Sequence, residues 1–415
     1  MTLLSCQFST RVLNRCLAAT VAFAAVFALL VPGAVRSVHA EGPPARLEPD
    51  HGIYFGVNLD WARDTPEAFS ERLGLAPAVY VSFMHFPLGP DGRTRLDEFA
   101  QQLTRAHAMG LLTLEPAVAL DDITPQLAQD LGETLAAYNR RGIPLIVRFA
   151  HEMNGSWYSW SQQPTAYVHA FRTVAQAIHD TAPLTAMLWA PNYAGGYPFT
   201  GGPYAAVAGS QDYADLDTTG DGVVDQWDDP YAPYYPGDDA VDWVGMTIYH
   251  WGDHWPWGKN VVPEPDKFVR QLTGSYVGVG GDDRMLPNFN AIYAIGHHKP
   301  MAIPETSAFF NTTVTGDSEI EIKSRWWQQV FSAAVLDKLP AIKMINWFEW
   351  RKPESEVQGA VVDWTLTSDP HAVATFRNDL PLDRFLFASD MIFQLPQWSL
   401  VDGGSQRAGL NVSPL

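Results

Sequence analysis

The chain has 415 residues, of which 46 are acidic and 27 are basic, so its formal net charge is −19. This balance argues against nucleic acid and anionic membrane surfaces as partners, and it is compatible with a neutral polymer. The length fits one elaborated α/β barrel, or two smaller domains, and is ample for a sizeable core.

Residues 1–40 have the pattern of a secretory signal peptide. Arg11 and Arg15 precede a 15-residue apolar run, Leu17 to Val31, and Val38-His39-Ala40 then offers small residues for cleavage. The run is somewhat short for a membrane span, and an uncleaved signal anchor is the alternative.

Both cysteines, Cys6 and Cys16, lie inside the expected signal peptide. The mature chain therefore has no disulfide and no thiol chemistry. We expect a secreted, extracellular protein with one catalytic domain over residues 41–415. We also expect a monomer with no membrane contact once the signal is removed.

Downstream, short apolar runs alternate with helical patterns. The expected strands are Ile53–Leu59, Ala78–Met84, Leu111–Val118, Pro144–Glu152, Thr185–Asn192, Val241–Tyr249, Lys299–Thr306 and Ile342–Glu349. The expected helices are Pro66–Leu73, Arg95–Met109, Pro125–Arg141, Pro164–Thr181, Pro265–Leu272, Leu286–His297 and Glu319–Leu339.

Eight nearly continuous apolar strands indicate a parallel sheet that helices cover. Eight strand–helix units predict an α/β fold of the (β/α)8 TIM-barrel type, with a long loop insertion at residues 193–240 after the fifth strand. A doubly wound open sheet is the competing architecture. It would usually show a Gly-rich phosphate loop after an early strand, and this sequence has none.

The fourth strand ends in a segment rich in polar and aromatic side chains, Arg148 to Trp157. Alternation along a strand predicts Arg148, Ala150 and Glu152 on one face and His151 on the other. A buried strand that delivers a carboxyl group beside tryptophans suits acid catalysis on a sugar. A strand-to-loop transition with a surface Glu is the plain alternative.

Other expected strands also end in polar or aromatic residues, where a TIM barrel places its catalytic groups. The fifth ends at Asn192, the sixth at Tyr249-His250, and the seventh at Glu305. Glu152 and Glu305 lie three strand–helix units apart, which predicts that they face each other across the barrel mouth. Two such carboxyl groups can cleave a glycosidic bond.

Three segments together resemble glycoside hydrolase family 26, the β-mannanase family. They are His151–Trp157, Trp189–Asn192 and Tyr234–Gly245, which includes Pro-Gly-Asp-Asp and Val-Asp-Trp-Val-Gly. The resemblance covers roughly residues 50–400. It implies a retaining enzyme with Glu152 as general acid/base and Glu305 as nucleophile.

The resemblance also implies roles for substrate-binding residues. Tyr249 would hydrogen-bond the nucleophile, Trp347 would stack under the sugar at the cleavage point, and His151 and Trp157 would line the same subsite. Asn192 belongs to the second matching segment and is a further substrate-binding candidate. Arg148 would lie deeper in the barrel and keep a carboxylate ionised.

Two positions depart from the family pattern. Ser307 occupies a place where family members often have Gly, and the segment Leu114–Ala117 lacks a Trp or His that many mannanases use to hold the sugar. The second departure bears on mannan specificity more than on glycosidase chemistry. Glu349 is an alternative nucleophile on the eighth strand.

A second motif, residues 217–228, has the spacing of a twelve-residue calcium loop. The expected ligands are Asp217, Thr219, Asp221, the Val223 carbonyl, Asp225 and Asp228, with Gly222 at the sharp turn. Thr219 is a weak ligand, and Asp228 stands where a bidentate Glu is usual. We expect no cofactor for catalysis and a possible structural calcium ion; an acidic Gly-rich turn is the alternative.

These features predict a secreted retaining endo-β-1,4-mannanase that acts on a polysaccharide partner. A β-glucanase or xylanase on the same scaffold is the alternative among enzymes. A catalytically silent carbohydrate-binding barrel or cell-wall protein is the alternative from another class, although the presence of both glutamates argues against it.

Overall fold

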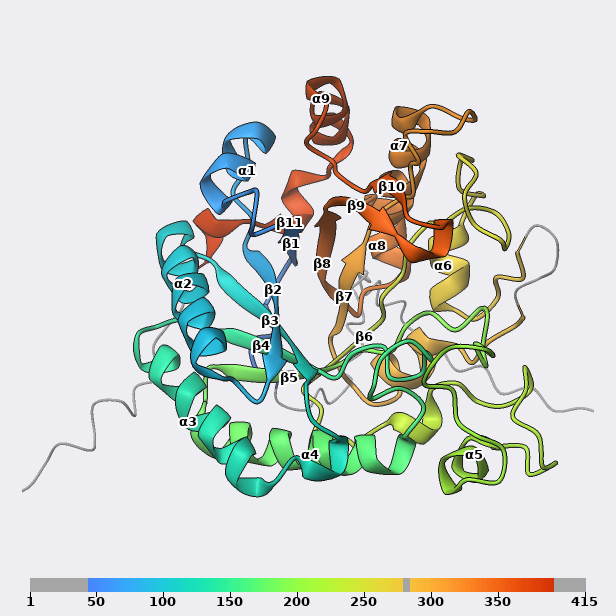
Figure 1. Cartoon of the computed structure of the whole chain (residues 1–415). Helices are drawn as coiled ribbons and strands as arrows, with labels where there is room; N and C mark the ends of the chain where they lie inside the picture. Colours follow the sequence, from blue (N-terminus) through green and yellow to red (C-terminus); the bar gives the residue numbers. More distant parts are fainter. Residues whose placement is uncertain (1–43, 279–283, 392–415) are drawn as a thin grey trace, which may run out of the picture. The chain divides into compact units, whose positions relative to one another are not determined.

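The computed structural model describes residues 44–278 and 284–391, and these form a closed barrel of parallel strands (Figure 1). Strands β1 to β8 are neighbours in chain order, and β1 also pairs with β8 over Tyr54–Leu59. The predicted (β/α)8 barrel is therefore confirmed, and an open doubly wound sheet is excluded because the ladder has no free edge between β1 and β8. The predicted signal peptide lies outside the described residues.

The barrel strands are β1 (Ile53–Leu59), β2 (Val79–Phe86), β3 (Met109–Pro116), β4 (Leu145–Phe149), β5 (Thr185–Trp189), β6 (Trp243–Gly245), β7 (Met301–Thr306) and β8 (Ile342–Glu349). The helices are α1 (Pro66–Leu73), α2 (Pro90–Ala106), α3 (Pro125–Arg140), α4 (Pro164–Thr181), α5 (Gln211–Leu216), α6 (Lys267–Leu272), α7 (Glu319–Val330), α8 (Ala333–Lys338) and α9 (Pro370–Asp379), with a π-helix at Asn290–Ile295.

Three further strands follow or flank the barrel. A hairpin of β9 (Arg351–Glu354) and β10 (Ala360–Asp363) comes directly after β8, and β11 (Phe385–Leu386) pairs in parallel with the start of β1. Neither these strands nor α9 was predicted. The helix expected over Glu319–Leu339 is divided into α7 and α8, because the chain turns at Phe331 and Ser332.

Several predicted helix starts are confirmed by their caps. Thr65 accepts a hydrogen bond from Ala68 N before α1, and Thr124 accepts one from Leu127 N before α3, in each case with Pro at the first helical position. Ser318 and Glu321 form a capping box at the start of α7.

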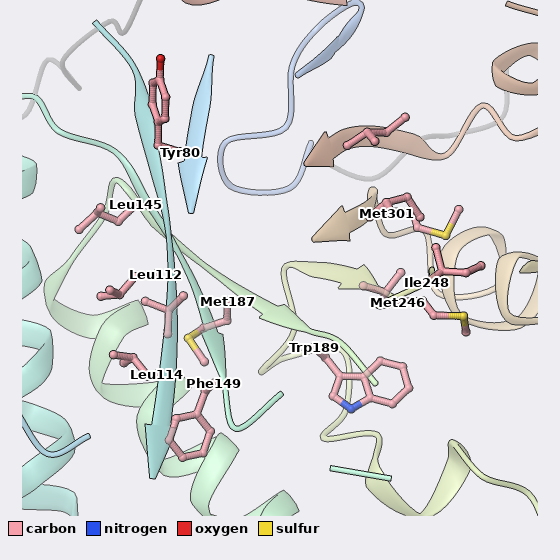
Figure 2. Packing of buried hydrophobic residues seen from close by; sticks show 14 of the residues in the cluster. Tyr80, Leu112, Leu114, Leu145, Phe149, Met187, Trp189, Met246, Ile248 and Met301 are labelled. Atoms are coloured by element: carbon pink, nitrogen blue, oxygen red, sulfur yellow. The ribbon is translucent and has the colours of Figure 1, made fainter. Parts of the chain in front are cut away.

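Alternation along the strands separates two apolar layers. Leu112, Leu145 and Met187 belong to the large cluster that packs the sheet against the helices, and Figure 2 shows part of this layer. Their neighbours Leu111 and Ile146 belong to a smaller cluster inside the barrel. A residue's parity along a regular strand therefore decides whether it faces the helices or the barrel interior.

The expected insertion after the fifth strand is confirmed: the chain leaves β5 at Trp189 and returns at β6 with Trp243, and the short helix α5 lies between them. Strands β4, β5 and β6 end earlier than predicted, because the residues after Phe149, Trp189 and Gly245 leave the ladder as loops. Across residues 44–278 and 284–391, no helix has the length and apolar character needed to cross a bilayer.

Candidate active site

Glu152 lies three residues beyond the end of β4, in a tightly held turn. Ala150 and Glu152 have φ angles of 46° and 55°, in the left-handed region that non-glycine residues rarely adopt. Backbone hydrogen bonds from Ala150 N to Leu114 O (2.9 Å) and from Glu152 N to Ala190 O (3.0 Å) fix the turn to both neighbouring strand ends. Such conformations cost on the order of 1 kcal/mol or more and are concentrated at functional sites.

Because of this turn, the predicted alternation of side chains after Phe149 is wrong. His151 and Glu152 were expected on opposite faces, but their side-chain atoms lie within 4.8 Å of Glu305 and of each other. The reason is that left-handed residues break the two-residue period of a strand. Arg148, inside the regular part of β4, does face the barrel interior as predicted, because it shares the parity of Ile146.

Glu305 reaches the same place by a different irregularity. Strand β7 pairs Ile303 with Ile345 and Thr306 with Trp347, so three steps along β7 match two along β8. This bulge inserts one residue and re-aims the side chains after it. Thr306 thus accepts a hydrogen bond from Trp326 of α7 at 2.9 Å, while Glu305 faces the barrel mouth.

Glu305 is held by donors on both carboxylate oxygens. The guanidinium of Arg148, which is fully buried, forms an ion pair with one oxygen, and the Tyr249 hydroxyl donates to the other at 2.9 Å. Arg148 also donates to the hydroxyl of Thr247 and lies 4.0 Å from Glu152. This pattern of donors suits an ionised carboxylate.

Glu152 has a different environment. Burial, and next the negative charge of Glu305, raise the pKa of Glu152 to about 7; Arg148 and the indole of Trp157, which donates at 3.0 Å, oppose this rise. The neighbouring carboxyl groups are therefore set up differently, with Glu152 able to keep its proton near neutral pH.

His151 lines the site as an uncharged imidazole. Burial, with the charge of Arg148 adding to it, lowers the pKa of His151 well below its usual range. Its Nε2 lies 3.2 Å from the hydroxyl of Tyr158, whose ring stacks on Trp160 at 4.5 Å. The π-stacked pair fixes the ring that His151 contacts.

Glu305 and His151 open onto a cleft of about 650 Å³. Its walls come from the ends of β1, β2, β3, β4, β7 and β8 and from one face of α2, and they include Glu305, His151 and Tyr158. Clefts of this size at the C-terminal face of a TIM barrel are the usual place for a substrate.

Trp157 and Tyr249 contact the two glutamates as described. Asn192 instead contacts Asn154, a residue of the segment that follows Glu152. Asn192 N donates a hydrogen bond to Asn154 Oδ1 at 2.8 Å, and Asn154 Nδ2 donates one to Asn192 O at 2.9 Å. Asn192 thereby joins the β5 end to the turn that holds Glu152, and it does not line the cleft described above.

The prediction that Trp347 stacks under the sugar is wrong for this structure. Trp347 is fully buried, packs on Phe331 at 6.2 Å and donates to Trp364 O at 3.0 Å. Strand β8 is regular here, so Trp347 shares the helix-facing parity of Ile345. Phe348 and Trp350, with stacked rings 5.7 Å apart, line the cleft instead.

The alternative nucleophile Glu349 also faces away from the cleft. Its carboxylate accepts hydrogen bonds from Leu366 N at 2.6 Å and Thr367 N at 2.8 Å, behind β8. The sequence reasoning missed Thr247, Tyr158 and Trp350. Parity along the eighth strand could have pointed to Trp350, whereas the contacts of Thr247 and Tyr158 depend on the closed barrel.

Residues 217–228 form a turn-rich loop in which the acidic side chains bind their own backbone. Asp217 accepts hydrogen bonds from Gly220 N and Gly222 N at 2.8 and 2.7 Å, and Gly222 has the positive φ expected of it. Asp228 is fully buried and accepts from Thr219 N at 2.9 Å and Asp225 N at 2.8 Å. In this conformation, Asp228 is engaged within the loop.

Within the described part of the chain, His151, Glu152 and Glu305 are the one group of three or more metal-binding side chains whose ligand atoms lie within 4.8 Å of one another. Arg148 already provides a positive charge against Glu305. We therefore interpret this cluster through proton transfer and nucleophilic attack.

Residues 96–221 match the family model described as glycosyl hydrolase family 26, and this segment includes His151 and Glu152. The match covers less than a third of the chain. This match supports a glycoside hydrolase, and the closed barrel of the chain agrees with it.

Two curated proteins match the chain by sequence. Endoglucanase H of Acetivibrio thermocellus is 23% identical over 264 residues, which are 62% of this chain and 21% of that protein. β-1,3-Xylanase TXYA of a Vibrio species is 24% identical over 392 residues, which are 87% of this chain and 71% of that protein. The matched part thus spans only about a fifth of endoglucanase H.

Many solved structures match the chain, and two of them serve as examples of the shared fold. GH26C from a Muricauda species has a TM-score of 0.53 and 14% identity, and the match covers 83% of this chain and 90% of that one. A double mutant of the endo-β-1,4-mannanase of Cellulomonas fimi has a TM-score of 0.50 and 16% identity, with 82% and 73% covered.

Proposed function

We propose that this glycoside hydrolase cleaves internal β-1,4 linkages of mannan-type polysaccharides with retention of configuration. The observation that supports this best is the pair Glu152 and Glu305, with carboxylate oxygens within 4.8 Å of each other. Retaining enzymes have their carboxyl groups about 5–5.5 Å apart, whereas inverting enzymes need about 6.5–9.5 Å to admit a water molecule.

In the first step, Glu152 donates its proton to the glycosidic oxygen while a Glu305 oxygen attacks the anomeric carbon. The glycosidic bond breaks, the leaving chain departs as an alcohol, and the glycone is bonded to Glu305. In the second step, Glu152, now ionised, takes a proton from water; the water oxygen attacks the anomeric carbon and releases Glu305. Arg148 and Tyr249 orient Glu305, and Trp157 orients Glu152.

A β-xylanase or β-glucanase is the second candidate. The relatives support it, because by name one acts as a β-1,3-xylanase and the other as an endoglucanase. The segment Leu114–Ala117, which lacks the Trp or His of many mannanases, also supports it; Glu115, near the end of β3, lines the cleft there. A silent carbohydrate-binding protein is the remaining candidate.

We test the proposal by incubating the purified protein with β-1,4-mannan, mixed-linkage glucan, β-1,4-xylan and β-1,3-xylan. The released oligosaccharides and the anomer first formed, followed by NMR, identify the sugar, the linkage and the stereochemistry. Internal cleavage of mannan with retention is the expected result. Retained binding without any cleavage would favour the silent protein, and inversion would contradict the double displacement.

We further propose that residues 1–40 are a signal peptide that directs secretion of the protein. In addition, we propose that the protein acts on its polysaccharide as a monomer and needs no catalytic cofactor. We also propose a structural calcium ion in loop 217–228. The spacing of Asp217, Asp221 and Asp225 and the turn at Gly222 support this. Since Asp228 is already bound within the loop, the remaining ligands would have to supply most of the coordination.

A further inference from the structure

The cleft is asymmetric about the two glutamates. Within the described residues its walls include Glu305 but not Glu152, and they extend from Glu305 across the ends of β1 and β2 to helix α2. In a double displacement, the nucleophile bonds to the sugar of the glycone, and the proton donor faces the leaving chain. The extension toward α2 is therefore on the glycone side.

The outer end of this cleft, which we call the α2 arm, has one wall on a single face of the helix. Arg95, Glu98, Phe99 and Gln102 all line it, and their spacing of three and four residues places them on the same side of α2. The arm is separate from the glutamates along the chain, and no sequence motif pointed to it.

Next to this helix face, the α2 arm offers an aromatic surface in a fixed position. Trp61 follows β1, donates from Nε1 to Val81 O at 2.8 Å, and packs edge-on against Phe99 at 5.2 Å. It is only half-buried, so part of its indole remains available to the cleft. An aromatic ring held in this way is suited to contact the apolar C–H face of a sugar.

The polar groups of the α2 arm suit a neutral ligand. Asp60 and Glu98 provide acceptors and Arg95 provides donors, so the wall matches hydroxyl groups, which both donate and accept. Gln102 gives a more specific indication that a ligand could bind here. Its Oε1 is buried and has no hydrogen-bond partner in the part of the chain that the structure describes, although buried polar atoms normally have one.

We propose that the α2 arm is a glycone-side subsite that binds a neutral sugar unit distant from the cleaved bond, with Trp61 as its apolar surface and Arg95 and Gln102 as polar contacts. The unit is either a further sugar of the backbone or a branch sugar attached to it. This inference rests on the proposed glycosidase function, and it makes Trp61, Arg95 and Gln102 specificity-determining residues.

The test compares Arg95→Ala and Gln102→Ala with Arg105→Ala and Gln101→Ala. The control residues, Arg105 and Gln101, are exposed on the same helix and lie outside the described cleft wall. The control variants therefore remove the same types of side chain, an Arg and a Gln, from a surface that does not line the cleft. kcat/KM is measured on linear manno-, gluco- and xylo-oligosaccharides from disaccharide to hexasaccharide, on a galactose-branched mannan oligosaccharide, and on an aryl glycoside of a single sugar.

We expect Arg95→Ala and Gln102→Ala to lower kcat/KM about 3- to 10-fold on the longer or branched substrates, as loss of one hydrogen bond predicts, and to leave the aryl glycoside unchanged. Trp61→Ala should show the same dependence with a larger loss, and its melting curve reports whether it folds. A loss on linear substrates identifies a backbone sugar; a loss confined to the branched substrate identifies a branch sugar.

Equal kcat/KM for the arm variants and their controls on every substrate would overturn the α2 arm while the glycosidase function stands. An equal loss on the aryl glycoside would also overturn it, because a remote subsite does not contact that substrate. No turnover of any substrate by the unaltered protein would instead refute the proposed function, and the inference with it.

Discussion

The two glutamates are positioned by opposite means. Glu305 lies within β7, and a bulge of one residue turns it toward the barrel mouth, where Arg148 and Tyr249 bind it. Glu152 lies beyond β4, in a turn with two left-handed residues, and Trp157 is its close donor. One carboxyl group is thus fixed by the sheet and a buried cation, and the other by a loop with little charge compensation.

This difference shows how one barrel can position two carboxyl groups so that one serves as nucleophile and the other as proton donor. A nucleophile must be ionised and fixed against the reacting carbon, which a charged donor on a strand provides. A proton donor must keep its proton until the leaving oxygen arrives, which burial next to another carboxylate favours. The predictions below remove one part of this contrast at a time.

The largest effect is expected from removing the carboxyl groups themselves. On polysaccharide, Glu152→Ala should lose about 10²–10⁴-fold in kcat, the usual contribution of a general acid, and Glu305→Ala at least as much. An aryl glycoside with an acidic phenol needs no proton to leave, so it should restore the first step in Glu152→Ala only. A burst of phenol measures this step; a burst from Glu305→Ala would reverse our assignment.

Arg148→Met removes the cation that binds Glu305 and leaves a buried carboxylate without it. We expect a loss of about 3–5 kcal/mol in unfolding free energy, as for other broken buried pairs, together with lower kcat. The matched control is Arg172→Met, which breaks the exposed pair with Asp239 and should cost less than about 1 kcal/mol. Urea unfolding of both variants measures the difference, and equal losses would contradict the role of Arg148.

Glu152→Gln should change how stability depends on pH. Because the pKa of Glu152 is raised to about 7 in the folded protein, the folded state holds this proton more tightly than the unfolded state. Stability is therefore lost as pH rises from the unfolded pKa near 4.5 through about 7, by about 3 kcal/mol. The Gln variant should gain that amount at pH 8 and little at pH 4.

Chemical unfolding at both pH values tests this expectation. Glu133→Gln, on the exposed surface of α3, is the matched control and should leave the pH dependence unchanged. A Glu152→Gln variant that is no more stable than the parent protein at pH 8 would show that burial does not raise the pKa of Glu152.

Trp157→Phe should move the alkaline limb of activity to higher pH. The indole hydrogen bond favours ionised Glu152, so its loss should raise the pKa of Glu152 further. The pH profile of kcat/KM measures the shift. Trp160→Phe removes an indole bond to the His151 carbonyl instead and should leave the limb in place.

The smallest effect is expected far from the glutamates, in loop 217–228. If calcium binds there, chelation should lower the melting temperature, because a ligand that binds only the folded state stabilises it. Asp221→Asn keeps the shape of the side chain and should abolish the response to chelation. A melting temperature that chelation leaves unchanged in the parent protein would refute the calcium site.

Much of the fold could be predicted because the signals are local. Pro at helix starts and apolar runs of strand length identified the eight-unit barrel, with β1 and β8 predicted to the residue. The hairpin β9–β10 and helix α9 were missed, since they are short or weakly patterned and depend on packing against the rest of the domain.

The site was predicted less evenly. Trp347 was chosen from the family resemblance, but regular alternation in β8 buries it and exposes Trp350 to the cleft. The opposite happened at His151 and Glu305, where alternation is broken and the chain still delivers both side chains to the mouth. Periodicity is a reliable guide only where the strand remains regular.

The sequence by itself determined the barrel, the two glutamates and the strand ends that hold them, because these follow from short-range patterns and residue chemistry. Only the tertiary structure decided the distance between Glu152 and Glu305, their different environments and the α2 arm. Each of these depends on groups far apart in the chain, which meet only when β1 pairs with β8 and the barrel closes.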